Sequence, residues 1–291
     1  KDVYTAMNVS AMATEKIHIG SAVTNLQTRH PTVTANATTA LDDLSNDRAM
    51  LGLGAGWVAL HSIGKMPDKL GAVRQGINEF RQLFSGEEAE LYGTTVRLAT
   101  ARRQVPIYLA VSQPGMLRLS GEICDGAILM GAADPEFCKW QLDYIYQGLE
   151  KSGRQRSDIL IDLIVTMSID DDEENALNDV RAWATSQAAT FAVWKKVPPA
   201  WERFREEFTI AEQAYHYEEH LSLRAEHKQI VSDDFVKSVT IAGNFETCVA
   251  KLKEVAKLDI DRITFALLSG GRFRRLEELG QKVIPALRQN N

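Results

Sequence analysis

The chain is predicted to form an α/β protein, and more specifically a TIM (β/α)8 barrel. Apolar segments of strand length alternate with amphipathic helical segments along most of its 291 residues, as expected for a parallel sheet covered by helices. This length suits a barrel better than a doubly wound open sheet. Neither a low-complexity linker nor a solenoid-type repeat interrupts the pattern, so we expect a single domain over residues 1–291.

The individual elements follow from hydrophobic period and from turn and helix-start residues. We expect helices over residues 2–14, 31–44, 69–84, 114–124, 135–152, 245–257 and 276–287, and strands over 16–23, 48–54, 105–111, 127–131, 159–169 and 262–268. Residues 87–102 are expected to form a surface excursion of short extended pieces, and about 173–235 a mainly helical insertion. Because a barrel needs two more strands, we expect its first strand, first helix and second strand to precede Lys1.

Composition narrows the function classes. A net charge of -6 argues against a broad basic surface for nucleic acid or an anionic membrane. No apolar run approaches the ~20 residues of a membrane span, and no signal peptide is visible. The three cysteines have no spacing typical of a disulfide framework or a zinc site, so we expect a cytoplasmic protein.

The most informative segment is a βαβ unit over residues 105–129. An apolar strand ends before Ser112 and Gln113, and Pro114 and Gly115 then open a helix. Proline at the first helical position loses only an N–H that would be unpaired there, and glycine lets a ligand approach the backbone. The free N–H groups predict an anion site at the carboxyl end of a strand.

A second segment carries three alternating glycines, Gly52, Gly54 and Gly56, followed by Trp57. The dinucleotide-binding pattern fails because Trp57 stands where its third glycine belongs. Two interpretations are open. The glycines relieve crowding at the mouth of the barrel, or they leave room for a planar cofactor with Trp57 as a wall.

Other polar residues give weaker signals. His216 and His220 have the spacing of helical metal ligands, but no third ligand stands out, and we expect no metal site. Arg29 and His30 suit either a cleft or a cap, and His61 is a candidate pocket-lining donor. The acidic run 170–174 is expected to start a helix, and the turn 269–272 suits an anion or a simple loop.

Several ordered motifs together resemble the bacterial luciferase-like superfamily, and within it the deazaflavin-dependent oxidoreductases of the methylenetetrahydromethanopterin reductase type. The match covers residues 2–131 and returns at 240–268. The motifs are Gly20-Ser-Ala-Val-Thr-Asn with Arg29-His-Pro, Leu41-Asp-Asp-Leu-Ser-Asn-Asp-Arg leading to Gly52-Leu-Gly-Ala-Gly, and Pro106-Ile-Tyr-Leu-Ala with Gly121-Glu-Ile-Cys-Asp-Gly.

The resemblance implies a TIM barrel of the luciferase-like type that binds coenzyme F-420, or alternatively FMN, at the carboxyl ends of its strands. A non-prolyl cis peptide that supports the cofactor ring is implied within Ser21, Ala22 and Val23. The remaining implied cofactor contacts are Thr24, Ala55 and Gly56 at the ring, with Trp57 beside them, and Ser112, Gln113, Gly115 and Met116 at the phosphate-bearing tail. A homodimer is also implied.

The implied reaction is hydride transfer between the reduced deazaflavin and a small organic substrate. The alternatives are an FMN-dependent monooxygenase and a non-catalytic flavin-binding protein. Some sugar-phosphate dehydrogenases of the family carry a catalytic Glu where this chain has Trp57, which disfavours that substrate class. Acidic and His residues that relatives carry on the first two strands are not in this sequence, so no catalytic residue is assigned.

Overall fold

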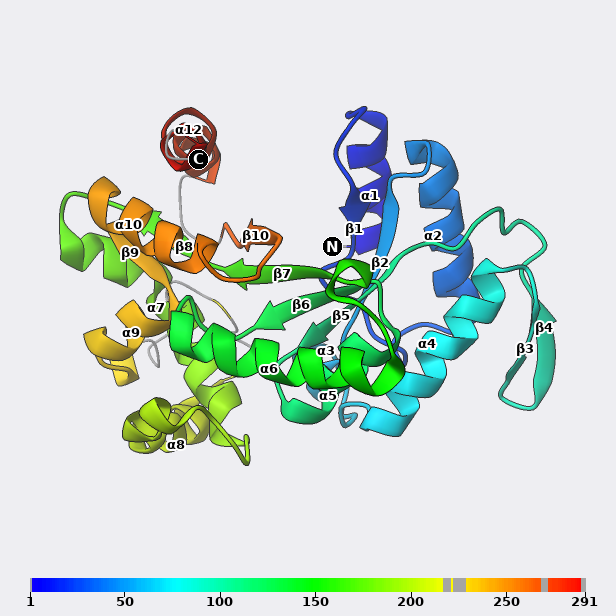
Figure 1. Cartoon of the computed structure of the whole chain (residues 1–291), viewed down its shortest axis with the longest axis horizontal. Helices are drawn as coiled ribbons and strands as arrows, with labels where there is room; N and C mark the ends of the chain where they lie inside the picture. The colour runs from blue at the N-terminus through cyan, green and yellow to red at the C-terminus, as the bar shows by residue number, and fades with distance from the viewer. Residues whose placement is uncertain (1, 217–220, 222–228, 268–271, 289–291) are drawn as a thin grey trace. The chain divides into compact units, whose positions relative to one another are not determined.

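The computed structural model describes residues 2–216, 221, 229–267 and 272–288 and divides the chain into two compact units (Figure 1). The first unit comprises Lys1–Ile128 and Tyr144–Leu160, and the second comprises Leu129–Asp143 and Ile161–Asn291. The expectation of a single domain stays a prediction.

Most of the first unit alternates helix and strand. Its elements are α1 (Val3–Met12), β1 (Ile19–Gly20), α2 (Pro31–Ser45), β2 (Ala49–Leu53), α3 (Trp57–His61), α4 (Leu70–Phe84), β3 (Glu88–Leu91), β4 (Thr94–Arg97), β5 (Ile107–Val111), α5 (Pro114–Ile123), β6 (Gly126–Met130), whose last two residues fall in the second unit, and a 3-10 turn, η1 (Arg156–Asp158).

The sheet of the first unit follows the order β1-β2-β5-β6. Strand β2 pairs in parallel with β1, with Ile19 opposite Ala49, and with β5, with Leu51 opposite Ile107. Strands β3 and β4 form a separate antiparallel hairpin, which confirms the surface excursion predicted over residues 87–102 (Figure 1). The carboxyl ends of β1, β2 and β5 therefore meet at one edge of the sheet.

The loops at the other edge are held by side chains that bind backbone groups. Arg48, which is buried, donates to the carbonyls of Ala11, Thr14 and Ile17 and fixes the chain between α1 and β1. The Asp125 carboxylate accepts the N–H of Ile107 at 2.7 Å. In the second unit, Asp261 accepts the N–H of Ile161 in the same way, also at 2.7 Å. Such contacts stabilise the amino-terminal ends of the strands. The carboxyl ends of the strands are then left for ligands.

The second unit contains part of α6 (Pro135–Ser152) and nearly all of β7 (Leu160–Val165). The elements that follow along the chain are β8 (Met167–Ile169), α7 (Glu173–Ala192), η2 (Pro199–Phe204), α8 (Arg205–Ala214), α9 (Asp233–Val239), β9 (Ile241–Gly243), α10 (Phe245–Ala256), β10 (Arg262–Phe265), α11 (Arg272–Glu278), η5 (Leu279–Val283) and α12 (Ile284–Arg288).

Aromatic packing holds the helical part of this unit together. Phe191 of α7 contacts Phe137, Trp194, Trp201 and other rings, with centroids 4.4 Å apart in the Trp194 pair. Trp194 and Trp201 belong to this buried core. In the described part of residues 173–235 the structure has α7, η2, α8 and the start of α9, and the expected insertion stays a prediction.

Several elements of the second unit differ from the sequence prediction. The segment predicted as one strand over 159–169 changes partner at Thr166, because β7 pairs with β10 whereas β8 pairs with β9. Strand β9 was not predicted. The last helix begins at Arg272 instead of residue 276, and it contains a π turn, η5, in which Ile284 donates to the Leu279 carbonyl.

The predicted strand over 262–268 ends at Phe265, and its last residue, with most of the turn 269–272, lies outside the described residues. The expected position of the first barrel strands before Lys1 stays a prediction. In the part of the chain that the structure describes, no helix is both long and apolar enough to cross a membrane.

Candidate functional site

The segment after β1 leaves the strand ladder for three residues. Ser21 is buried and its hydroxyl donates to the Gly52 carbonyl at 2.8 Å. The peptide bond between Ala22 and Val23 is cis, within the three residues for which the family resemblance implies it. Ala22 is exposed and Val23 is 42% exposed, so both side chains are accessible to solvent.

Thr24 returns the chain to strand β2. Its N–H donates to the Gly52 carbonyl at 2.9 Å, and its own carbonyl accepts from Gly54 at 2.8 Å. The strand predicted over residues 16–23 is therefore wrong in length. Only Ile19–Gly20 has regular pairing, because the chain bulges before Thr24.

Two of the three glycines make room for this bulge. A Cβ at Gly52 would lie 1.8 Å from the Ser21 carbonyl oxygen, and one at Gly54 would lie 2.7 Å from Val23 Cγ2. Of the two interpretations left open by the sequence, relief of crowding is thus correct for Gly52 and Gly54. Their space is filled by the chain itself.

Gly56 and Trp57 begin a short helix that the sequence did not predict. Gly56 has a φ of 88°, a conformation that favours glycine, and precedes α3. The half-buried Trp57 ring packs edge-on against His61, with centroids 4.9 Å apart. The structure thus pairs the predicted wall residue with the predicted pocket-lining histidine.

The segment 112–116 forms the predicted helix start. Pro114 is the first residue of α5, and Leu117 donates to the Gln113 carbonyl to close the first turn. The N–H groups of Gly115 and Met116 have no acceptor within a helix at these positions. Beside them, Gln113 Nε2 is a buried donor without a partner in the described structure.

All of these predicted residues lie at the carboxyl ends of three neighbouring parallel strands of one unit. Thr24 follows β1, residues 55–57 follow β2, and residues 112–116 follow β5. Adjacent strands are about 4.8 Å apart, so the three segments line one continuous edge. This edge is the usual position of ligands in parallel α/β sheets.

One polar residue at this edge gave no sequence signal. Asp68 donates its N–H to the Ala55 carbonyl, and its Oδ1 accepts from Gln27 Nε2 at 2.9 Å. Burial raises the pKa of Asp68, and its Oδ2 is buried without a partner in the described part of the chain. Asp68 lies in an irregular loop, where the sequence has no periodic pattern. Only its contact with Ala55 shows that it lies at this edge.

The other candidate residues named from the sequence have structural roles or lie outside the described residues. His30 caps α2 by accepting from the Thr32 N–H, and Arg29 pairs with Asp2. Asp172 caps α7, as the acidic run predicted. His220 lies outside the described residues, and no cluster of three metal-ligating side chains occurs among the described ones. All three cysteines are buried free thiols.

Comparison with known proteins supports this fold. A reductase from Methanopyrus kandleri, 5,10-methylenetetrahydromethanopterin reductase, is 28% identical over 97% of this chain and 86% of its own length. An F-420-dependent glucose-6-phosphate dehydrogenase from Microbacterium testaceum is 32% identical over 59% of this chain and 55% of its own length.

The solved structure of the coenzyme F-420-dependent tetrahydromethanopterin reductase from Methanopyrus kandleri superposes with a TM-score of 0.78. The match has 24% identity and covers 99% of this chain and 88% of that one. This likeness, together with the family model reported next, confirms the predicted luciferase-like TIM-barrel fold class. The family model described as luciferase-like monooxygenase matches residues 1–262. The chain therefore belongs to the luciferase-like monooxygenase family.

Proposed function

We propose that this protein is an oxidoreductase that transfers a hydride between reduced coenzyme F-420 and a small organic substrate. The observation that carries the proposal is the gathering of the Ser21–Val23 bulge and the open start of α5 at one strand edge. Two of the relatives reported above are named for F-420. The solved reductase structure covers 99% of this chain, and the glucose-6-phosphate dehydrogenase covers 59%.

The ring of the cofactor would lie against the bulge. Ser21, Ala22 and Val23 form its support, and Thr24 continues it. From the next strand, Ala55 and Gly56 offer backbone groups, and Trp57 with His61 forms a side wall. Because the Ser21 hydroxyl is bound to Gly52, the support is held in place before any ligand arrives.

The phosphate-bearing tail would lie at α5, and the residues there fit an anion. Gly115 and Met116 supply free N–H groups at the positive end of the helix. The unpartnered Gln113 Nε2 is a further donor, and Ser112 supplies a hydroxyl. A Cβ at Gly115 would have Leu70 as its nearest neighbour at 3.4 Å, so the backbone here is open to close approach.

When bound, the reduced deazaflavin supplies the hydride. The protein orients the substrate and excludes water at the strand edge. Burial raises the pKa of Asp68, because it disfavours the charged form of the carboxyl group. Trp57 stands where sugar-phosphate dehydrogenases of the family carry a Glu, so we expect a substrate other than a sugar phosphate. A homodimer and a cytoplasmic location are further parts of the proposal.

The test is turnover. Reduced F-420 is mixed with the full chain and candidate substrates, and reoxidation is followed through the violet absorbance of the oxidised cofactor. Substrate-dependent reoxidation supports the proposal. Oxygen-dependent turnover with reduced FMN alone would instead make the protein a monooxygenase. Tight binding of a cofactor with no turnover under either condition would make it a binding protein.

A further inference from the structure

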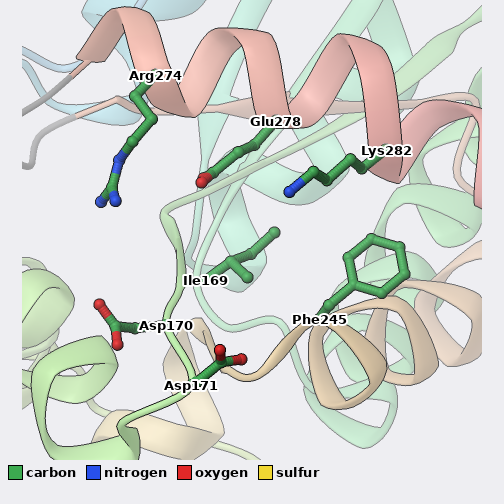
Figure 2. Close-up of a pocket in the computed structure, with 7 residues that line it drawn as sticks. All are labelled: Ile169, Asp170, Asp171, Phe245, Arg274, Glu278 and Lys282. Carbon is green, nitrogen blue, oxygen red and sulfur yellow. The ribbon is translucent and has the colours of Figure 1, made fainter.

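The second unit contains a cavity of about 490 Å³ (Figure 2). It lies at the carboxyl end of the parallel pair β8–β9. Ile169, the last residue of β8, and Phe245, two residues after the end of β9, form its apolar surface. None of the residues predicted for the F-420 site lines it. Its volume is in the range of small-molecule sites.

The polar walls of this cavity carry opposite charges. Arg274 and Lys282 project from α11 and η5, and Asp170 and Asp171 follow β8 on the other side (Figure 2). Figure 2 shows the Arg274 guanidinium extending toward Asp170 across the cavity. No ion pair within 4 Å joins these walls in the described part of the chain.

The fifth charged residue of the cavity, Glu278, already has an ion-pair partner. Glu278 accepts from Arg275 Nη1 at 3.2 Å. Arg275 is 2% exposed and also pairs with Asp179 at 2.7 Å and with the Ser168 hydroxyl at 2.8 Å. This network holds the helix wall against β8 and α7. Arg274 and Lys282 on one wall, and Asp170 and Asp171 on the other, have no ion-pair partner within 4 Å among the described residues.

Separated charges of opposite sign favour a ligand that itself carries both signs, since each charge then gains a partner. We propose that this cavity binds a small zwitterion with an apolar side chain, the chemical class of an aliphatic or aromatic α-amino acid. Its carboxylate faces Arg274 and Lys282, its ammonium group faces Asp170 and Asp171, and its side chain packs on Ile169 and Phe245. No residue of this cavity is among those proposed for F-420, and the proposal does not rest on that site.

Calorimetric titration of the full chain with L-phenylalanine and L-leucine tests the proposal. The matched probes are 3-phenylpropionate, which lacks the ammonium group, and phenethylamine, which lacks the carboxylate. We expect at least one amino acid to bind saturably, and each charge-deleted probe to bind at least about tenfold more weakly than L-phenylalanine. No saturable binding of either amino acid, or equal affinity for the three phenyl compounds, would overturn the proposal.

Two variants locate the binding. Arg274→Gln and Asp170→Asn should each weaken amino-acid binding about tenfold, and Arg274→Gln should also remove the preference for L-phenylalanine over phenethylamine. The control is Arg272→Gln, the same change at an exposed position of the same helix that does not line the cavity. Circular dichroism and the unfolding midpoint verify that each variant is folded. Equal affinities in Arg274→Gln and Arg272→Gln would place any binding elsewhere and refute the assignment.

Discussion

The main-chain carbonyl oxygen of Ser21 occupies the space that a side chain at Gly52 would need, because a Cβ at that position would lie 1.8 Å from it. Neither partner can move easily, because Gly52 lies in the paired strand β2 and the Ser21 hydroxyl is bound to the Gly52 carbonyl. Gly52→Ala should therefore destabilise the protein by at least about 3 kcal/mol in urea unfolding, the upper range of overpacking. The control is Gly71→Ala in α4, where a Cβ would have no neighbour within 4 Å. Equal stability of the two variants would refute this role of Gly52.

At Gly115, in contrast to Gly52, the space that a side chain would occupy is empty in the protein without a ligand. A Cβ there would contact only Leu70, at 3.4 Å, and alanine is a better helix former than glycine. Gly115→Ala should keep or slightly raise stability while it weakens F-420 binding by about tenfold. Fluorescence titration with F-420, and with a deazaflavin that lacks the phosphate tail, measures the effect. Unchanged affinity for F-420, or an equal loss for the tail-less compound, would contradict a tail site at α5.

Arg275 should be a large single contributor to the stability of the second unit. Its guanidinium, 2% exposed, pairs with both Asp179 and Glu278, so Arg275→Met leaves two carboxylates without their cation. We expect a loss of about 3 kcal/mol in the free energy of unfolding, at the lower end for a broken buried pair because Asp179 is partly exposed. Arg272→Met is the exposed control on the same helix. A loss below about 1 kcal/mol would show that the network is not stabilising.

The lowered pKa of Lys251 predicts that the free energy of unfolding rises with pH. Its ammonium group donates to the Thr240 carbonyl at 2.7 Å and to the Lys237 carbonyl, and burial lowers its pKa from 10.5 to about 8. Asp134, Cys138 and Cys248 are the ionisable groups that influence it. Between pH values of about 8 and 10.5, Lys251 is still protonated in the unfolded chain but has lost its proton in the folded chain. Increasing pH therefore favours folding.

The check is the free energy of unfolding of the wild type and of Lys251→Met between pH 7.5 and 10. The difference between them should move in favour of the wild type as pH rises through about 8. Lys253→Met, two positions along α10, controls for the loss of a lysine from this helix. A difference that is constant, or that moves the other way, would mean that Lys251 keeps its ordinary pKa in the fold.

The sequence predicted the structure best at positions where a residue type fits only one kind of local structure. Pro114 and Gly115 located the start of α5 correctly, because proline fits the first helical position and is strongly disfavoured in later turns. The cis peptide was implied by family resemblance alone, since no local residue pattern predicts a non-prolyl cis bond.

The failures have physical causes that involve distant parts of the chain. Strand β1 is short because its residues bulge against Gly52, a contact 31 positions away in sequence. Strand β9 has only three residues, Ile241–Gly243, too few for a period to be recognised. The π turn precedes Pro285, which cannot donate the usual helical hydrogen bond. The surroundings of Asp68 and the cavity beside Arg274 are formed by residues far apart in the sequence, so no local pattern predicts them.

The central claim is that this strand edge is built for a deazaflavin, and equilibrium titration of the full chain with F-420 and with FMN tests it most directly. The account predicts saturable binding of F-420 at one site per chain, at least about tenfold tighter than FMN. Selective loss of that binding in Gly115→Ala, in a variant that stays folded, would place the cofactor at the start of α5. Tighter binding of FMN than of F-420, or no binding of either, would contradict the account.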